Sequence, residues 1–406
     1  MFKTNTLLKR FCNNETLKYL STSYQKNKQC NLPITQILEK YKILFDQSNI
    51  LEEIFPRQFS NDEELSSFFN LSSFSPLISA KDKITLDSIN KSVNLPLWDL
   101  LDRGGKRWRP ILGLMVAKYY NINIEDHYKN MTLYKIIGCI EVLHNATLMI
   151  DDVIDKSDYR RNKPCTYKLF SEGTAINAGI GLLYYPINKI MLTMNEREKY
   201  KFLVSYINEM TAINFGQTID YEMNYSKRII NVSNYVDTVL CKTGVLPRLM
   251  VKQIFDLCVD EEEKHTKTIN EILKVMDLMS IAFQIEDDIL NLTENDLSKN
   301  KGMLGEDIFE GKLTLLVIRA IEKLKEADSN RLREILFMKT KDQKLLSEAI
   351  ELIRLGGGFE FAIEYCEKCV TDATHICLNL PIDNKTSEES IYEIIELIKY
   401  LTKRKI

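Results

Sequence analysis

Two acidic patches in otherwise apolar surroundings are the residues of this chain best suited to chemistry. They read Asp151-Asp152-Val153-Ile154-Asp155 and Asp287-Asp288-Ile289-Leu290-Asn291. In a helix, the first and last residues of each patch share one face because they lie four positions apart. Carboxylates crowded in apolar surroundings need cations, and hard oxygen ligands select Mg²⁺ or Mn²⁺. Because Mg²⁺ commonly joins one or two carboxylates to substrate phosphates, the patches predict a diphosphate that is held through metal.

Two basic clusters supply groups that bind phosphate. In Gly104-Gly105-Lys106-Arg107-Trp108-Arg109-Pro110, glycine lets the backbone approach an anion closely, while Lys and Arg offer a point charge and a planar fork. Arg160 and Arg161 follow the first acidic patch by one or two turns, so one anion can contact both metal and guanidinium. A solvated basic turn and a surface ion pair with Asp158 are the alternative interpretations.

Length and composition fit a protein with a large hydrophobic core. The 406 residues are 45% hydrophobic, and 54 basic against 57 acidic residues give a net charge of −3, so no global field indicates nucleic-acid binding. The nine cysteines follow no disulfide-framework spacing, which predicts free thiols in a reducing compartment. The sequence has no uninterrupted apolar run of about 18 residues, so we expect no transmembrane helix.

Helical periodicity dominates the chain from about residue 34 onward, and alternating strand patterns are nearly absent. We expect a helical and loop extension over residues 34–79, with a loop over 59–79, and one all-α domain over residues 80–406. Segments that are apolar on most sides, such as 136–150, indicate helices buried inside a bundle. The expected helices cover residues 84–101, 108–120, 131–154, 175–194, 200–223, 234–258, 265–290, 313–325, 343–355, 359–378 and 390–401.

Residues 1–33 differ in composition from the rest of the chain. The first 24 residues contain four basic residues and several serines and threonines, and their only acidic residue is Glu15. Such a composition is typical of a transit segment for a plastid-type organelle or a mitochondrion. A disordered tail on a cytoplasmic protein is the alternative.

Taken together, these motifs resemble the polyprenyl synthetase family, the trans-isoprenyl diphosphate synthases. The resemblance begins with Gly104–Pro110, continues through Leu143-His144-Asn145-Ala146-Thr147-Leu148-Met149-Ile150 into the first acidic patch, and includes Arg160-Arg161. Further matches follow in the family's order: Gly216-Gln217-Thr218-Ile219-Asp220, Lys242-Thr243-Gly244, Phe283-Gln284-Ile285-Glu286-Asp287-Asp288, Lys301 and Glu306-Asp307-Ile308-Phe309-Glu310-Gly311-Lys312. They extend from about residue 85 to the C-terminus, and their residue patterns are most similar to those of the geranylgeranyl diphosphate synthases.

The resemblance implies an all-α fold, a large helical bundle of the isoprenoid synthase type with a central active-site cavity. It also implies a prenyltransferase that condenses isopentenyl diphosphate with dimethylallyl, geranyl or farnesyl diphosphate and releases diphosphate. Breaking the allylic C–O bond builds negative charge on the diphosphate, which metal ions and fixed cations stabilise, and an apolar tunnel excludes water from the carbocation. Family members usually form homodimers, so we expect a homodimer here.

The family pattern also assigns roles to individual residues. By that pattern Asp151, Asp155 and Asp287 are the candidate metal ligands, with Asp152 and Asp288 rotated by about 100° from the ligating face. The matching residues for the allylic diphosphate are Arg160, Lys242, Thr243, Gln284, Lys301 and Lys312, of which Arg160, Lys242 and Gln284 are the candidate catalytic groups. Those for isopentenyl diphosphate are Lys106, Arg109, His144 and Arg161. A lone histidine on an apolar helix is usually a satisfied core residue, but His144 lies two turns before the metal face.

Three positions depart from the family pattern. Asn291 ends the second patch where many relatives have Asp, which geranylgeranyl-type enzymes of eukaryotes tolerate. Asn162 replaces a glycine after the paired arginines and favours a different local turn. Ile180 stands where an Asp often occurs in relatives, and nothing in the sequence explains that change.

Small residues before the first acidic patch predict the length of the product. Ala146 and Thr147 lie five and four positions before the patch, where farnesyl-length enzymes of the family place aromatic rings as a tunnel floor. Gly181 leaves further room on the next helix, while Tyr184 and Tyr185 can supply a deeper stop. We therefore expect a product of geranylgeranyl length or longer, and a shorter product after Ala146→Phe or Thr147→Phe.

Other functions compete with this interpretation. Cys366, Cys369, His375 and Cys377 are soft ligands close together and suggest zinc, but their segment is expected to form one continuous helix, whereas zinc knuckles need turns. A non-catalytic subunit of a heteromeric prenyl synthase typically loses acidic or basic groups that this chain keeps. A class I terpene cyclase shares the first acidic patch but lacks the basic pocket that the residues from 104 to 110 supply. A helical scaffold would place its acidic patches in water rather than among apolar neighbours.

Overall fold

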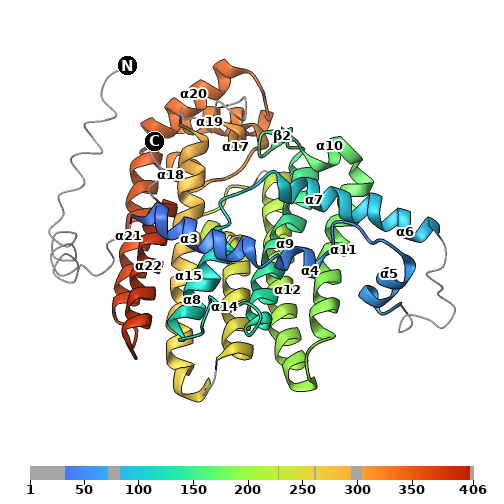
Figure 1. Ribbon diagram of the computed structural model, residues 1–406. Helices are drawn as coiled ribbons and strands as arrows, with labels where there is room; N and C mark the ends of the chain where they lie inside the picture. The colour runs from blue at the N-terminus through green and yellow to red at the C-terminus, as the bar shows by residue number, and fades with distance from the viewer. Residues whose placement is uncertain (1–32, 72–82, 227, 260–261, 294–303, 403–406) are drawn as a thin grey trace.

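The computed structural model describes residues 33–71, 83–226, 228–259, 262–293 and 304–402. Within these ranges the chain is almost entirely helical, which confirms the predicted all-α fold (Figure 1). The elements are α3 (Ile34–Gln47), α4 (Ile50–Ile54), α5 (Asp62–Phe69), α6 (Lys83–Ile89), the π-helical turn η2 (Asn90–Asn94), α7 (Leu95–Asp102), α8 (Trp108–Tyr119), α9 (Met131–Asp155), β1 (Tyr159–Arg160), β2 (Lys163–Pro164), α10 (Thr166–Phe170), α11 (Glu172–Met191), α12 (Glu196–Ser226), α13 (Val232–Lys242), α14 (Val245–Cys258), α15 (Glu262–Asn291), α17 (Glu306–Glu310), α18 (Leu315–Lys323), α19 (Glu326–Met338), α20 (Gln343–Leu355), α21 (Gly358–Leu378) and α22 (Lys385–Thr402).

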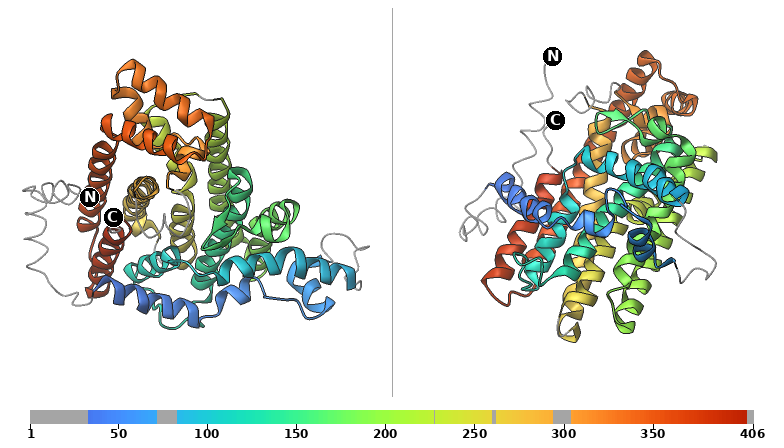
Figure 2. Two further views of the ribbon diagram at one scale, coloured as in Figure 1. Left: turned by 90° about the horizontal axis from the view of Figure 1, so that it is seen from above. Right: turned by 45° about the vertical axis from the view of Figure 1, so that its right-hand side comes forward.

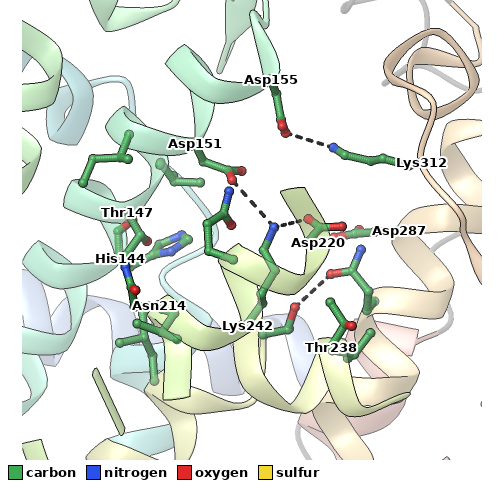
Figure 3. A pocket seen from close by; sticks show the side chains of 18 of the residues that line it. His144, Thr147, Asp151, Asp155, Asn214, Asp220, Thr238, Lys242, Asp287 and Lys312 are labelled. Atoms are coloured by element: carbon green, nitrogen blue, oxygen red, sulfur yellow. Dashed lines mark hydrogen bonds and ion pairs between the residues drawn. The ribbon is translucent and has the colours of Figure 1, made fainter. Parts of the chain in front are cut away.

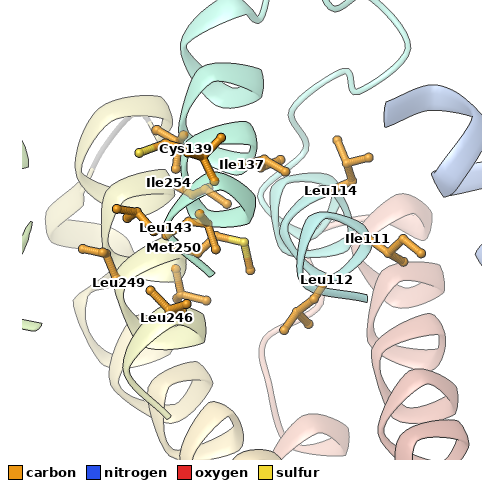
Figure 4. Close-up of a cluster of buried hydrophobic side chains, with 14 of the residues drawn as sticks. Ile111, Leu112, Leu114, Ile137, Cys139, Leu143, Leu246, Leu249, Met250 and Ile254 are labelled. Atoms are coloured by element: carbon orange, nitrogen blue, oxygen red, sulfur yellow. The ribbon is translucent and has the colours of Figure 1, made fainter. Parts of the chain in front are cut away.

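Helix α9 is the centre of the bundle. It packs against α8, α11 and α14, and apolar side chains of α8, α9 and α14 interdigitate along its length (Figure 4). Ile111, Ile137 and Leu249 in this cluster are 1% exposed or less. By length and composition alone α9 could cross a membrane, but 72% of its most apolar 18-residue window is buried inside the fold. Such burial is what a core helix that is apolar on most sides requires.

A break between α13 and α14 divides the segment that the sequence predicted as one helix, 234–258. The backbone N–H groups of Thr243 and Gly244 both donate to the carbonyl of Val239, so the chain turns within two residues. A Cβ at Gly216 would lie only 2.7 Å from Cβ of Cys241, which shows how closely α12 crosses α13. Because the two helices meet there without a side chain between them, the end of α13 lies against α12.

A second apolar cluster forms around α18 to α21 and packs on α15. Within it, helices α19 and α20, in orange, lie at the same end of the bundle as the β1–β2 hairpin (Figures 1 and 2). The two-residue turn of the hairpin is Arg161-Asn162, with φ angles of +52° and +62°. Asparagine tolerates this left-handed conformation better than other non-glycine residues. Asn162 can therefore replace the glycine of the family pattern at this turn.

The N-terminal helices share the same hydrophobic core as the rest of the bundle. Helix α3 packs against α8 and α22, and α4 packs against α9. The expected loop over 59–79 is partly wrong, because α5 begins within it. Asn61 caps α5 by accepting a hydrogen bond from the backbone N–H of Glu64 at 2.9 Å. An asparagine is a common helix N-cap, but the many serines and phenylalanines of this segment favoured a loop in the sequence analysis. The expected boundary at residue 80 lies outside the described residues, and the division into extension and domain stays a prediction.

Candidate active site

A cavity of about 750 Å³ contains most of the predicted functional residues (Figure 3). Its wall is formed by α8, α9, α11, α12, α13, α14, α15 and the segment from α17 to α18. This volume is in the range of small-molecule binding sites. The predicted residues that line it are Arg109, His144, Thr147, Asp151, Asp155, Arg160, Tyr184, Lys242, Thr243, Gln284, Asp287, Asp288 and Lys312. Lys301 lies outside the described residues.

The two acidic patches meet in this cavity. Asp151 and Asp155 project from the last turns of α9, and Asp287 projects from the last turns of α15 (Figure 3). The predicted sharing of one helix face by Asp151 and Asp155 is confirmed. Both helices also direct their C-terminal ends, which carry a partial negative charge, toward this region. The combined field favours a cation between the two helices.

Asp152 does not line the cavity. It is fully buried, and its Oδ1 accepts hydrogen bonds from Nε of Arg160 at 2.9 Å and from Nη2 of Arg160 at 2.5 Å. The grouping of Asp152 with the candidate metal ligands is therefore not supported, because the 100° rotation per residue carries its carboxylate to the hairpin side of α9. In that place Asp152 fixes Arg160, which does line the cavity.

Asp288 lies at the buried edge of the cavity and belongs to a hydrogen-bond network. Its carboxylate accepts from the hydroxyl of Tyr235 at 2.7 Å and from Nε2 of Gln284 at 2.9 Å. The hydroxyl of Thr243 in turn donates to Oε1 of Gln284 at 2.9 Å. Burial raises the pKa of Asp288 to about 7, against the opposing effect of the hydrogen bonds from Gln284 and Tyr235. The network fixes Gln284 and Thr243 at the cavity wall.

Asn291 lies outside the cavity lining. Its Oδ1 accepts from the backbone N–H of Asp307 at 3.1 Å, and its carbonyl accepts from the backbone N–H of Gly305 at 3.1 Å. The side chain thus connects the end of α15 to the start of α17. An amide serves as well as a carboxylate in this role, which accounts for Asn at the end of the second patch.

Two lysines oppose the acidic groups of α9 across the cavity. Nζ of Lys242 is 3.7 Å from Oδ1 of Asp151, and Nζ of Lys312 is 3.1 Å from Oδ2 of Asp155. Burial lowers the pKa of both lysines, but the surrounding carboxylates outweigh burial and hold each pKa above its ordinary value. Burial raises the pKa of Asp155, whereas the cations led by Lys242 overcome burial and lower that of Asp151. Both lysines are therefore charged at neutral pH.

The acidic residues fit a divalent cation that binds together with a diphosphate. No group of three or more Asp, Glu, His or Cys side chains in the described ranges is close enough to form a finished metal site. However, carboxylate oxygens from two helices face one cavity, and Mg²⁺ needs only one or two of them when water and phosphate oxygens complete its octahedron. Asp151, Asp155 and Asp287 are the residues that would hold it.

Arg109 and His144 form the basic side of the cavity below α8. Burial lowers the pKa of Arg109 to about 10, so its guanidinium is still charged at neutral pH. The guanidinium lies 4.3 Å from the ring centroid of Trp108, and its Nε makes no hydrogen bond within the described part of the chain. Burial, together with the neighbouring arginines, lowers the pKa of His144 well below its usual value, so the imidazole is neutral.

Lys106 and Arg161 do not line this cavity. Lys106 borders a smaller hollow between α3, α8 and α22, while Nη1 of Arg161 donates to the carbonyl of Leu100 at 2.8 Å. The side chain of Arg161 lies against Gly105, where an added Cβ would make an ordinary contact of 3.4 Å with Cζ of Arg161, but where the φ of +155° favours glycine. A missed residue is Glu141, which is 3% exposed and accepts from Nη1 of Arg107 at 2.8 Å. The sequence could have indicated Glu141, because it lies ten residues before the first acidic patch and on the same side of α9 as His144.

The far end of the cavity is apolar. Thr147 lines it one helical turn below Asp151, Leu183 and Tyr206 line it on α11 and α12, and the exposed side chains of Tyr184 and Ile207 border it. Tyr206 is only 3% exposed, and its hydroxyl donates to the carbonyl of Leu183. The sequence did not single out Tyr206, because one tyrosine in a helix without a distinct apolar face gives no sign of the cavity that it closes.

Two expected product-length residues are placed differently. Ala146 is fully buried against α11, where its carbonyl would lie 3.1 Å from a Cβ on Gly179, and it does not line the cavity. The expected free space at Gly181 is also wrong, because the ring of Tyr185 fills it: a Cβ at Gly181 would lie 2.5 Å from Cε2 of Tyr185. Tyr185 itself packs against the aromatic rings of Phe55 and Phe69, away from the cavity.

The cysteine-rich segment forms one continuous helix, α21, as predicted. Cys366 and Cys369 are buried, and Sγ of Cys366 lies 3.5 Å from the carbonyl of Ala282 on α15. These thiols thus pack between α21 and α15, and this placement offers no turn that could gather four ligands around zinc.

Comparison with curated proteins finds isoprenyl diphosphate synthases among the similar proteins. The chain is 28% identical over 339 residues to a geranylgeranyl pyrophosphate synthase of Penicillium canescens, with coverage of 83% of this chain and 95% of that protein. It is 30% identical over 313 residues to a short chain isoprenyl diphosphate synthase of Methanocaldococcus jannaschii, with coverage of 77% and 84%.

Solved structures share the fold. A polyprenyl synthase of Caulobacter crescentus, solved with calcium and isoprenyl diphosphate, has a TM-score of 0.70 at 18% identity, with coverage of 92% of this chain and 98% of that chain. A geranylgeranyl pyrophosphate synthetase of Pyrococcus horikoshii has a TM-score of 0.69 at 24% identity, with coverage of 90% and 100%. Residues 90–353, well over half of the chain, match the polyprenyl synthetase family. The chain therefore belongs to the polyprenyl synthetase family and is a prenyltransferase.

Proposed function

We propose that this protein condenses isopentenyl diphosphate with an allylic diphosphate and releases a product of geranylgeranyl length. The observation that carries the proposal is the continuity of one cavity. Acidic and basic groups that suit a metal-bound diphosphate line its mouth, and apolar side chains line its depth. The relatives named as geranylgeranyl and short chain synthases support the same activity.

The mouth of the cavity suits cleavage of the allylic C–O bond. Lys242, Lys312 and Arg160 place fixed positive charge where the leaving diphosphate gains negative charge, so they stabilise the transition state more than the bound substrate. Magnesium bound to Asp151, Asp155 and Asp287 would add charge stabilisation at the same oxygens. Two structures of similar fold were solved with isoprenyl diphosphate and a divalent cation, calcium in one and magnesium in the other, which supports this choice of ion class.

The basic side of the cavity suits the second diphosphate. Arg109 has an unused Nε, and neutral His144 can donate one hydrogen bond without adding charge. Arg161 and Lys106 lie nearby on the Gly104-Gly105 turn side but do not reach the cavity wall. We propose Arg109 and His144 as direct contacts and Arg161 as a residue that orders the turn.

The depth of the apolar shaft supports a twenty-carbon product. Asp151 lies five residues above Ala146, which is level with Gly179, and Leu183 lies four residues further down α11. At 1.5 Å rise per residue these steps place the floor formed by Tyr206 about 13 Å below Asp151. An extended isoprene unit spans about 4–5 Å from ordinary bond lengths, so about three units fit. A farnesyl primer then fits fully, and its geranylgeranyl product is too long to re-enter as a primer.

An exposed apolar face supports the homodimer. Ile176, Ile180 and Tyr184 are spaced four residues apart on α11, and Leu203 and Ile207 are spaced four apart on α12. All five side chains are at least 36% exposed, and Tyr184 and Ile207 also border the cavity. Monomeric proteins rarely expose contiguous apolar surface of this kind. The unexplained Ile180 belongs to this face. We propose that two copies pair through it, so light scattering should give twice the chain mass, and Ile180→Glu, outside the cavity lining, should reduce that mass to the monomer's.

We propose that the protein is targeted to an organelle, because residues 1–33 have a basic composition. These residues lie almost wholly outside the described part of the chain. A fluorescent protein fused after residue 33 would enter a plastid-type organelle or mitochondrion. Diffuse fluorescence in the cytoplasm would contradict the proposal.

Product analysis tests the function. The purified chain is incubated with isopentenyl diphosphate, Mg²⁺ and either geranyl or farnesyl diphosphate, and the dephosphorylated products are separated by chromatography. The proposal predicts geranylgeraniol from both primers. A cyclic hydrocarbon would identify a terpene cyclase, and absence of turnover with a folded protein would identify a non-catalytic subunit.

A further inference from the structure

Each cavity lysine contacts carboxylates from more than one helix. Figure 3 shows Lys242 between Asp151 and Asp220, and Lys312 beside Asp155. Nζ of Lys242 lies 2.6 Å from Oδ2 of Asp220 and 3.7 Å from Oδ1 of Asp151. Nζ of Lys312 lies 3.1 Å from Oδ2 of Asp155 and also contacts Oε2 of Glu310. In both sets one carboxylate belongs to the acidic patch of α9. Lys242 has its other partner on α12, and Lys312 has two on α17, Glu310 and the more distant Asp307 at 3.9 Å.

The carboxylates outside the acidic patch are well placed to keep their lysines. Asp220 makes the shorter of the two contacts to Lys242. Glu310 is 7% exposed and lies two residues before Lys312, across Gly311, whose φ of +80° turns the chain back on itself. The backbone N–H of Lys312 donates to the carbonyl of Asp307 at 2.8 Å, which fixes this turn. Neither contact depends on the α9 carboxylates.

We propose that Asp220 and Glu310 are positioning residues that hold the ammonium groups of Lys242 and Lys312 over the cavity while Asp151 and Asp155 exchange those ammonium groups for metal. The inference rests on the proposed function. A lysine stem is long and flexible, so an ammonium group that lost its only partner would leave the cavity for water. With a second carboxylate it stays charged and close to where the diphosphate binds.

The arrangement makes metal and diphosphate binding depend on each other. A divalent cation alone must take Asp151 and Asp155 from the lysines without offering the lysines a new partner. A diphosphate that arrives with the cation supplies that partner, because its oxygens accept from both ammonium groups. We therefore expect Mg²⁺ to bind weakly alone and tightly with inorganic diphosphate. By thermodynamic linkage, Mg²⁺ must increase the affinity for diphosphate by the same factor by which diphosphate increases the affinity for Mg²⁺.

Removal of either positioning carboxylate should weaken both ligands. In Asp220→Asn, Lys242 keeps its α9 carboxylate, Asp151, and in Glu310→Gln, Lys312 keeps Asp155 together with the more distant Asp307 at 3.9 Å. In each variant Mg²⁺ therefore competes against a firmer ion pair with α9. The half-saturating Mg²⁺ concentration and the dissociation constant of diphosphate should each rise about fivefold. The KM for the allylic substrate should rise similarly, and the KM for isopentenyl diphosphate should stay unchanged because Arg109 and His144 are untouched.

Calorimetric titration of inorganic diphosphate into the full chain at several Mg²⁺ concentrations tests the inference without turnover. Glu393→Gln is a matched control, because it removes a lysine–carboxylate pair of similar burial, with Lys118 at 3.0 Å, far from the cavity. Wild-type affinity for Mg²⁺ and diphosphate in either folded variant would overturn the inference and leave the proposed function standing. Absence of diphosphate binding to the wild-type protein would overturn both. Asp220 and Glu310 lie on separate helices, so if one variant does not fold, the other decides.

Discussion

Thr147→Phe should shorten the product, because Thr147 lines the shaft between the acidic mouth and the floor at Tyr206. Thr147 lies four residues below Asp151, or about 6 Å along α9. A phenyl ring across the shaft at that level would close the remaining depth of about 7 Å, which corresponds to one or two isoprene units at about 4–5 Å each. The main product should therefore fall from twenty carbons to fifteen or ten.

The assay for this prediction is chromatography of dephosphorylated products after incubation with isopentenyl diphosphate and dimethylallyl diphosphate. Thr147→Val is the matched control: it has nearly the volume of Thr but lacks the hydroxyl that donates to the carbonyl of His144 at 2.9 Å, and it should leave the product length unchanged. A folded Thr147→Phe variant with an unchanged share of twenty-carbon product would refute the assignment of the shaft. Ala146→Phe should instead destabilise the protein by about 1–3 kcal/mol through overpacking against α11, measured by thermal unfolding.

Three further predictions concern other parts of the cavity. Tyr206→Leu should deepen the shaft by about 4 Å, since a leucine is shorter than a tyrosine by about that length, and chromatography should show a product longer by about one isoprene unit; an unchanged product would remove Tyr206 as the floor. Arg109→Lys loses the planar fork and should raise the KM for isopentenyl diphosphate about tenfold, with the allylic KM unchanged in the same steady-state assay. His144 is neutral when folded but protonates when unfolded below about pH 6.5, so the unfolded state binds more protons there and stability falls as the pH drops. The slope is at most about 1.4 kcal/mol per pH unit, and equal slopes for wild type and His144→Gln in denaturant titrations would contradict this reasoning.

Long helices with a clear apolar period were predictable from the sequence, and short ones were not. Segments such as 131–154 and 343–355 match α9 and α20 closely, because a continuous apolar face can be buried in only one way. Helix α5 has only eight residues and depends on a cap and on packing against α11. Helix α19 is absent from the expected helices: its first turn contains Glu326 and Asp328, and its buried apolar residues, Leu332, Ile335 and Leu336, all lie in its second half. In both cases tertiary contacts decide what local propensity leaves open.

The candidate site was predictable where residue type and spacing alone define the chemistry. The four-residue spacing of Asp151 and Asp155 fixes a shared face in any helix, and the structure places both in the cavity. Contacts between distant elements could not be derived in this way. The pairing of Lys312 with Asp155 joins residues that are 157 positions apart, and the hydrogen bond from Tyr206 to Leu183 depends on how α12 crosses α11. Spacing along the chain contains no information about either contact.

The doubled aspartates of the two patches have a common physical logic. Successive residues of a helix point about 100° apart, so a pair of aspartates can serve two surroundings at once. In each pair the first carboxylate faces the cavity, and the second is buried beside a cavity residue that it fixes: Asp152 holds Arg160, and Asp288 holds Gln284. A lone aspartate in either helix would supply a metal ligand, but Arg160 or Gln284 would lose the carboxylate that fixes its side chain at the cavity wall. The second aspartate of each pair therefore matters because of the cavity residue that it fixes: Asp152 does so from outside the cavity lining, and Asp288 does so from its buried edge.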